Sequence, residues 1–370
     1  MGTFSHKGRI RVLVVEDSTT VRRHLVDTLR SDPEFEVIGE AEDGKRAIEI
    51  CREQRPDVIT MDMVMPVISG LAATEYIMAH FPTPILVVSA SINRGEVFRI
   101  YDSLAAGAVD VLEKPTGNEP DGAWERAFLS MVKLVAKIRV ITHLRARFAE
   151  RNERATAIVA TRGKSYIERP YDVLAMGAST GGPGAIVAVL RGLPPQFRHP
   201  ILIVLHINEP FGRVFADWLD GQTGRRVIHA TDGMPLTEAT GCAVVAPGGY
   251  HLMVRDGRMR LTLDPERHSC RPSVDVLFES VALEYGSAAA ACLLTGMGRD
   301  GALGLLKVRQ AGGFTVAQDE STSVIYGMPR EAALLGAAVE VLRLPDIAPR
   351  LAGLASRSAT MSAAQCEGRV

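Results

Sequence analysis

The chain has 370 residues, of which 46% are hydrophobic and 23% are charged, and its formal net charge is −1. This length predicts two domains of ordinary size, and the balanced charge gives no indication of a nucleic-acid partner. Five cysteines without CxxC spacing and an N-terminus without a long apolar stretch argue against a disulfide-rich or membrane-inserted protein, so we expect a cytoplasmic location and no direct membrane insertion.

Residues 1–118 are predicted to form a first α/β domain. Short apolar runs alternate there with segments of helical periodicity, and the runs lie at Arg11–Val15, Glu36–Glu40, Val58–Met61, Ile85–Ser89 and Val109–Leu112. Five β-type runs separated by helical segments predict a doubly wound parallel sheet that carries helices on both faces.

Residues 119–170 are predicted to form a helical linker. Between 123 and 160, apolar residues recur at helical spacing among many basic residues. This pattern predicts an amphipathic helix that packs against both domains. A basic amphipathic helix on a membrane surface is the less favoured alternative.

Residues 171–357 are predicted to form a second domain, followed by a flexible tail at 358–370. Strand candidates again alternate with helical segments, at Asp172–Met176, Pro200–Leu205, Ala243–Ala246, Arg258–Thr262, Ala290–Leu294, Phe314–Ala317 and Ala338–Leu342. The predicted fold class is therefore α/β, with two doubly wound parallel-sheet domains joined by a helical linker.

Polar side chains follow the apolar runs of the first domain. Glu16 and Asp17 end the first run, Asp62 ends the third, Ser89 ends the fourth and Lys114 follows the fifth. The carboxyl ends of parallel strands meet at one edge of a sheet, so these side chains should share a pocket. Clustered carboxylates suit Mg²⁺, and a phosphoryl group on Asp62 would be neutralised by that ion and by Lys114, with Ser89 as a hydrogen-bond donor.

The segments VVEDS, TMDMVMP, VVSAS and EKP make residues 10–116 resemble a response-regulator receiver domain, which implies a flavodoxin-like fold. On that resemblance Asp62 is the phospho-acceptor, and Ser89 and Lys114 are switch residues. The groups that would hold Mg²⁺ are Glu16, Asp17, Asp62 and the backbone carbonyl of Met63.

The second domain opens with YDVLAMGASTGG, a G-x-S-x-G pattern between an apolar run and a helical segment that contains Pro183. Such a turn holds a serine hydroxyl clear of the sheet, so Ser179 is the candidate nucleophile. A dinucleotide site is a rival interpretation. It is disfavoured because Ser179 occupies the place where the G-x-G-x-x-G pattern needs its second glycine.

A serine nucleophile needs a base, and the base needs a carboxylate that orients it. His206 ends the run PILIVLH and is the best candidate base, with His251 as the runner-up. Asp300 follows another apolar run in a glycine-rich loop, where the N–H of Met297 is our first choice for the oxyanion hole. The order serine, histidine, aspartate matches none of the three familiar triad orders, which disfavours a standard α/β-hydrolase.

The segments GASTGG, LHI, APGGYHL, RPSVDVLFES, TGMGRDGALGL and YGMPREA occur in this order through 171–345 and make this domain similar to the catalytic domain of chemotaxis protein-glutamate methylesterases, the CheB family. The resemblance implies a Rossmann-like domain with the triad Ser179, His206 and Asp300, and with Thr180 and Met297 beside it. It implies demethylation of glutamate methyl esters and deamidation of glutamines on a methylated chemoreceptor. It also implies a CheA-type histidine kinase as phosphodonor and no cofactor in the catalytic domain.

Two other functions were weighed against this hydrolase. A receiver linked to a catalytically silent protein-interaction module is disfavoured by the intact serine, histidine and aspartate set. A receiver-controlled DNA-binding regulator is disfavoured because the output domain has neither a basic balance nor a helix-turn-helix pattern.

Overall fold

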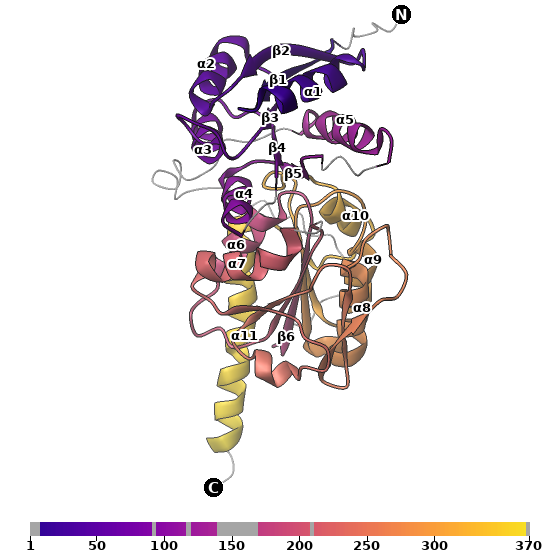
Figure 1. Cartoon of the computed structure of the whole chain (residues 1–370). Coiled ribbons are helices and arrows are strands. Elements are labelled where there is room, and N and C mark those ends of the chain that lie inside the picture. The colour runs from indigo at the N-terminus through magenta and orange to yellow at the C-terminus, as the bar shows by residue number, and fades with distance from the viewer. Residues whose placement is uncertain (1–7, 91–93, 116–119, 139–168, 208–210, 368–370) are drawn as a thin grey trace, which may run out of the picture. The chain divides into compact units, whose positions relative to one another are not determined.

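The computed structural model describes residues 8–90, 94–115, 120–138, 169–207 and 211–367, with side chains described to residue 355 apart from that of 213. The chain divides into two compact units, Met1–Glu153 and Arg154–Val370. Each unit is an α/β structure built on its own sheet (Figure 1). No helix among these described residues is long and apolar enough to span a membrane.

The first unit is a five-stranded parallel sheet in the order β2-β1-β3-β4-β5. Its strands are β1 Ile10–Val15, β2 Phe35–Ala41, β3 Val58–Met61, β4 Ile85–Ser89 and β5 Asp110–Glu113. The central strands are continuous apolar runs, as expected for strands covered on both faces. This is the flavodoxin-like strand order, and it confirms the predicted doubly wound sheet.

Helices cover both faces of this sheet: α1 and α5 lie on one side, and α2, α3 and α4 lie on the other (Figure 1). The helices are α1 Thr19–Arg30, α2 Gly44–Gln54, α3 Gly70–His80, α4 Arg94–Ala106 and α5 Ala123–Val135.

Helix α5 falls in the predicted linker but packs on β3, β4, β5 and α1 of the first unit. Its buried residues are Trp124, Phe128, Val132 and Val135, which lie on one face, and the indole N–H of Trp124 donates to the carbonyl of Glu113 at 2.7 Å. The apolar stripe, which predicted a helix that contacts both domains, therefore packs against the sheet of the first unit. The remainder of the predicted linker helix, at 139–160, lies outside the described residues.

The second unit is a seven-stranded parallel sheet in the order β14-β13-β12-β6-β7-β9-β8. Its strands are β6 Val173–Ala178, β7 Ile201–Leu205, β8 Val227–His229, β9 Ala243–Val245, β12 Ala289–Leu293, β13 Phe314–Gln318 and β14 Glu340–Leu342. The predicted parallel sheet is confirmed, although the three-residue strand β8 was not predicted.

A separate antiparallel hairpin joins β10 His251–Arg255 to β11 Arg258–Thr262. The sequence predicts a strand over Arg258–Thr262, but it does not predict β10 or this antiparallel pairing. The turn is Asp256-Gly257, and both residues have positive φ (53° and 65°). An Asp-Gly pair of this kind is a strong hairpin signal, and it could have identified the pairing.

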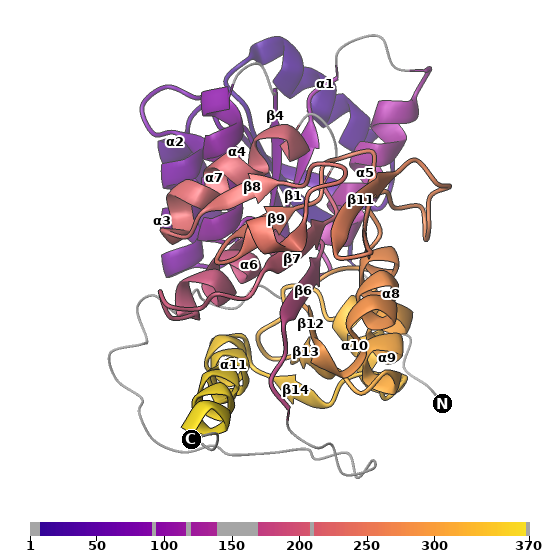
Figure 2. The same cartoon turned by 90° about the horizontal axis from the view of Figure 1, so that it is seen from below.

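In the second unit, α6, α7 and α11 lie on one face of the sheet, and α8, α9 and α10 lie on the other (Figures 1 and 2). The helices are α6 Gly182–Gly192, α7 Phe215–Thr223, α8 Val274–Tyr285, α9 Ala302–Gln310, α10 Met328–Leu334 and α11 Leu344–Glu367. Helix α11 runs through most of 358–370, where the sequence predicts a flexible tail. That segment contains three Ala, with one Met, one Gln and one Glu, and has no Gly or Pro before 368, so it can form a helix.

Both sheets place their polar residues at a point where the strand order reverses. In the first unit this point lies between β1 and β3, after which come Glu16 and Asp62. In the second it lies between β6 and β12, after which come Ser179 and Asp300. Ligands of open α/β sheets bind in the crevice at such points.

Candidate functional site

Ser179 lies in the turn that joins β6 to α6, where it is half-buried. Its N–H donates to the carbonyl of Thr295 at 3.0 Å, and its own carbonyl accepts from the N–H of Gly182 at 2.7 Å. Gly181 has a φ of 76°, a conformation that favours glycine, and a Cβ there would lie 2.6 Å from Val324. The turn thus fixes the Ser179 backbone between the end of β12 and the first turn of α6.

His206 and Asp300 come from the strands on either side of β6. The N–H of His206 donates to the carbonyl of Ala178 at 3.0 Å, which sets His206 beside Ser179 at the end of β7. On the other side, a Cβ on Gly296 would lie 2.8 Å from the Cβ of Ser179, so the loop after β12 also closes on the serine. The three predicted triad residues therefore share one edge of the sheet.

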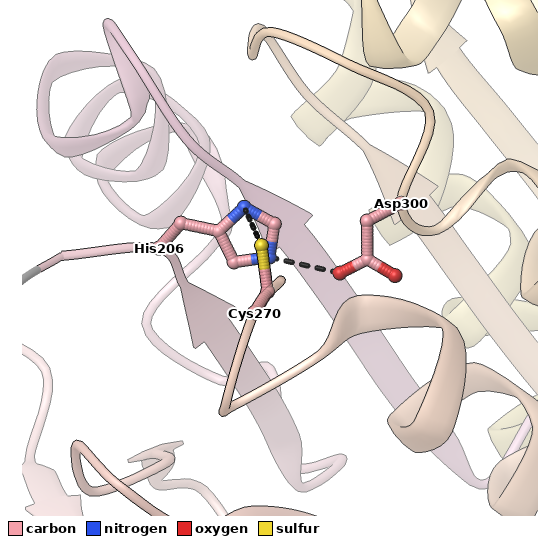
Figure 3. Close-up of side chains that lie close together, drawn as sticks. All are labelled: His206, Cys270 and Asp300. Atoms are coloured by element: carbon pink, nitrogen blue, oxygen red, sulfur yellow. Dashed lines mark hydrogen bonds and ion pairs between the residues drawn. The ribbon is translucent and has the colours of Figure 1, made fainter. Parts of the chain in front are cut away.

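Asp300 is held rigidly and bonds directly to His206 (Figure 3). Its Oδ2 lies 2.8 Å from Nε2 of His206 and accepts from the N–H of Val274 at 2.7 Å. Its Oδ1 accepts from the hydroxyl of Ser273 at 2.7 Å and from the N–H of Asp275 at 3.1 Å. The free N–H groups at the start of α8 thus bind the carboxylate, which favours its charged form.

The pKa values of the pair move apart. Burial would raise the pKa of Asp300, but the bonds from His206, Ser273 and Val274 outweigh burial and hold that pKa below its usual value. Burial would lower the pKa of His206, but Asp300 and then Cys270 outweigh it and raise that pKa to about 9. An ionised carboxylate only accepts, so Nε2 carries a proton and Nδ1 is the nitrogen that can act as a base.

The neighbour of that Nδ1 is a thiol. Cys270 Sγ lies 3.7 Å from Nδ1 of His206, as Figure 3 shows. Among the residues that the structure describes, no hydrogen bond joins Ser179 to His206. Cys270 is not among the site residues predicted from the sequence; it stands 64 residues from His206 and directly precedes the segment RPSVDVLFES.

The two residues predicted beside the triad lie in the same loops. The carbonyl of Thr180 lies 3.0 Å from the hydroxyl of Thr295, directly after β12. The side chain of Met297 is 54% exposed, in the loop between Thr295 and Asp300. The oxyanion role of the Met297 N–H stays a prediction.

Two other histidines lie near the site and are engaged with other groups. His251, the runner-up base, is buried and has both ring nitrogens engaged: Nδ1 accepts from the N–H of Ser273 at 3.1 Å, and Nε2 donates to the carbonyl of Pro265 at 3.2 Å. His268 pairs with the side chain of the buried Asp275 at 3.1 Å. His251 thus supports the backbone near the site, and His268 binds the start of α8.

The first unit holds the predicted acidic pocket. Lys114 Nζ lies 2.8 Å from Oε2 of Glu16 and 2.9 Å from Oδ2 of Asp62. Oδ1 of Asp62 accepts from the hydroxyl of Ser89 at 3.2 Å and from the N–H of Met63 at 2.7 Å. The strand ends thus bring these predicted residues together.

This pocket has the donor set of a magnesium site. Oxygen atoms of Glu16, Asp17 and Asp62 lie within 4.8 Å of one another, and Asp17 is exposed. Burial and then the charge of Asp62 raise the pKa of Glu16, even though Lys114 lowers it. Burial opposes the charge of Lys114, but Glu16 and Asp62 raise its pKa. Glu16 and Asp62 share the one ammonium of Lys114, and Asp17 adds a third carboxylate nearby, which leaves negative charge that a hard divalent cation would balance. The carbonyl of Met63 as a further ligand stays a prediction.

Comparison with known proteins gives matches over both units. Residues 174–351 match the family model described as CheB methylesterase, and residues 12–120 match the response regulator receiver domain. The chain is 43% identical to protein-glutamate methylesterase/protein-glutamine glutaminase 2 of Anaeromyxobacter dehalogenans, over 91% of this chain and 95% of that protein.

One further relative and one solved structure also match this chain. The protein-glutamate methylesterase/protein-glutamine glutaminase of Nitrosospira multiformis is 43% identical over 93% of this chain and 97% of its own. Among solved structures, the Thermotoga maritima CheB methylesterase catalytic domain is 34% identical, covering 50% of this chain and 98% of that one, with a TM-score of 0.48.

Proposed function

We propose that this chain, which belongs to the CheB family of protein-glutamate methylesterases/protein-glutamine glutaminases, carries out its hydrolysis with Ser179, His206 and Asp300. It is a receiver-controlled hydrolase that demethylates glutamate methyl esters and deamidates glutamines on chemoreceptors. The observation that carries the residue assignment is the His206–Asp300 bond at the strand end beside Ser179. The predicted location stays the cytoplasm.

The reaction is acyl transfer in two steps. Nδ1 of His206 takes the hydroxyl proton of Ser179, and the serine oxygen attacks the ester carbonyl. The tetrahedral oxyanion collapses, His206 returns the proton to the leaving oxygen, and methanol departs. Water, activated by the same nitrogen, then cleaves the acyl-serine and releases glutamate. With glutamine as substrate, ammonia leaves in place of methanol.

Asp300 keeps the imidazole in the tautomer that this chemistry needs. Four hydrogen bonds fix the carboxylate, so the carboxylate in turn fixes Nε2 as the protonated nitrogen. In the transition state, the same charge stabilises the imidazolium. The N–H of Met297 and the α6 terminus beside Thr180 are the proposed oxyanion donors.

Asp62 is the proposed phospho-acceptor, with a CheA-type histidine kinase as donor. Glu16, Asp17, Asp62 and the carbonyl of Met63 would hold Mg²⁺, which supplies charge neutralisation for phosphoryl transfer. Lys114 already contacts Asp62 and would bind a phosphoryl oxygen, and Ser89 would donate to another.

Methanol release from a methylated chemoreceptor tests both assignments. Ser179→Ala should lower kcat by roughly 10⁴-fold or more, because residual catalysis comes only from binding and the oxyanion donors. A small-molecule phosphodonor should stimulate the wild type but not Asp62→Asn.

Ser280→Ala is the matched control for Ser179→Ala. The hydroxyl of Ser280 binds the N–H of Val254 and the carbonyl of Leu277, away from the triad, so this variant should keep its turnover. Full demethylation by Ser179→Ala would overturn the nucleophile assignment. No methanol release from any form would favour the silent interaction module.

A further inference from the structure

A strained turn presents Cys270 to His206. Arg267 and Cys270 pair across it, with N–H to carbonyl distances of 3.1 and 2.9 Å. The two central residues, His268 and Ser269, have φ values of 53° and 60°. Turns with two positive φ values favour Gly, Asn or Asp, so this sequence adopts the turn at a conformational cost.

Contacts with α8 hold the turn in this conformation. Arg267 makes two parallel hydrogen bonds to the carboxylate of Glu279, at 2.6 and 2.9 Å. Nε2 of His268 lies 3.1 Å from Oδ2 of Asp275, which is fully buried. A strained turn persists only where its surroundings impose it, and functional sites are where such strain gathers. The proposed acyl-transfer steps do not use this turn.

The Nδ1–Sγ separation fits a shared metal ion. Zinc binds histidine nitrogen at about 2.0–2.1 Å and cysteine sulfur at about 2.3 Å, so a tetrahedral ion between them sets nitrogen and sulfur ~3.6 Å apart. The structure places these atoms 3.7 Å apart. An ion could therefore enter between them with little movement of either side chain.

Asp300 completes the arrangement from the far side of the ring. A histidine that binds zinc almost always donates its second ring N–H to a carboxylate or carbonyl. Here Nε2 binds Oδ2 of Asp300, which leaves the lone pair of Nδ1 facing Cys270. Each oxygen of Asp300 already accepts two hydrogen bonds, so this carboxylate supports the ring and does not bind the ion.

We propose that Nδ1 of His206 and Sγ of Cys270 form a reversible inhibitory site for Zn²⁺. Binding releases the thiol proton and, where the ring is charged, the Nδ1 proton to solvent, and it occupies the nitrogen lone pair that would otherwise deprotonate Ser179. Two protein ligands plus water make an exchangeable site, since structural zinc sites use four protein ligands and catalytic sites three. The inhibitory effect rests on the proposed function, whereas the binding does not.

The ligand types separate this site from the acidic pocket of the first unit. Glu16, Asp17 and Asp62 offer only oxygen, which suits Mg²⁺, whereas an imidazole and a thiolate suit Zn²⁺ or Co²⁺. Mg²⁺ in excess should fill the oxygen site and leave the Cys270 site open to zinc.

The test titrates the full-length protein with Zn²⁺ in excess Mg²⁺ and follows methanol release. Inhibition of the wild type should need at least roughly 100-fold less Zn²⁺ than inhibition of Cys270→Ala or Cys270→Ser, each compared with its own zinc-free rate. The serine variant keeps the size and polarity of the side chain, so a folding defect in the alanine variant does not decide the result. Cys242→Ala, a buried cysteine of the same domain, is the matched control and should keep the wild-type sensitivity.

A second readout does not depend on turnover. Co²⁺ should give a thiolate-to-cobalt absorption band in the wild type and in Ser179→Ala, and no band in Cys270→Ser. If both cysteine variants lose no zinc sensitivity, or if the wild type gives no cobalt band, the proposed site is wrong. A band in Ser179→Ala together with an inactive wild type would keep the metal site and overturn the esterase assignment.

Discussion

Asp62 and Asp300 occupy equivalent places in the two sheets but have opposite surroundings. Each follows a strand at the point where strand order reverses, and each is nearly buried, with 3% and 2% exposure. Asp62 bonds to the ammonium of Lys114 and the hydroxyl of Ser89, next to two other carboxylates. Asp300 bonds to three donors at the start of α8 and to His206.

This difference shows that the position at the sheet edge determines only where the aspartate lies, and that its neighbours determine its role. Burial, and then the charge of Asp62, raise the pKa of Glu16, and the clustered carboxylates suit a cation and a phosphoryl group. Burial opposes the charge of Asp300, but His206, and then Ser273 and the N–H of Val274 at the start of α8, lower its pKa and make it a fixed partner for a base. The four predictions below test that contrast.

Asp300→Asn should give the largest effect. The amide can no longer hold Nε2 of His206 as a hydrogen-bond donor, so kcat should fall by on the order of 10⁴-fold with and without a phosphodonor. The matched change Asp62→Asn should abolish only the response to the phosphodonor. Steady-state methanol release measures both effects. If Asp300→Asn, like Asp62→Asn, lost only its response to the phosphodonor and kept its basal kcat, the contrast between the two residues would be wrong.

Lys114→Ala should destabilise the first unit by about 3 kcal/mol, because Glu16 and Asp62 would face each other without a counter-ion. Added Mg²⁺ should recover part of this loss by replacing the missing charge. Urea unfolding with and without Mg²⁺ measures it. The control is Lys133→Ala, whose partners are Asp32 and Glu34 at the surface. Lys133→Ala should lose less stability, and Mg²⁺ should not restore it. If Mg²⁺ stabilised both variants equally, the metal site would be wrong.

The pH profile should show an acid limb set by His206. Burial lowers the pKa of this imidazole, but the opposing effects of Asp300 and Cys270 are larger and bring the pKa to about 9. The base is therefore mostly protonated below that pH. The initial kcat/KM should therefore rise about tenfold per pH unit and level off above the pKa. Cys270→Ala should move the midpoint to lower pH, because the thiol helps to raise the pKa. A flat profile through this range would contradict the assignment.

Ser273→Ala should give the smallest effect. It removes one of four bonds to Asp300, the 2.7 Å bond to Oδ1, so the carboxylate stays in place but holds His206 less well. We expect kcat to fall roughly tenfold with little change in KM. Ser280→Ala, within the helix that Ser273 precedes but bonded elsewhere, should change stability and leave kcat as it was. Equal kcat values in the two variants would show that Ser273 does not support the triad.

Much of the site could be predicted from the sequence because the signals are local. Apolar runs mark β1, β3, β6, β7 and β12, and the residue after such a run must lie at the sheet edge. That rule places Asp62, Ser179 and His206 without any knowledge of packing. It failed for β8 and β10, which are short or belong to a hairpin, and for the helix α5, whose apolar face does not reveal which sheet it covers.

The sequence by itself determined two parallel sheets and the polar residues that their strand ends carry, since period and motif depend on neighbouring residues only. The tertiary structure alone decided which groups complete each pocket. The start of α8 meets Asp300, and the 267–270 turn carries Cys270 to His206 across a separation of 64 residues. Such contacts arise from how helices and loops pack on the sheet, and a pattern along the chain holds no record of them.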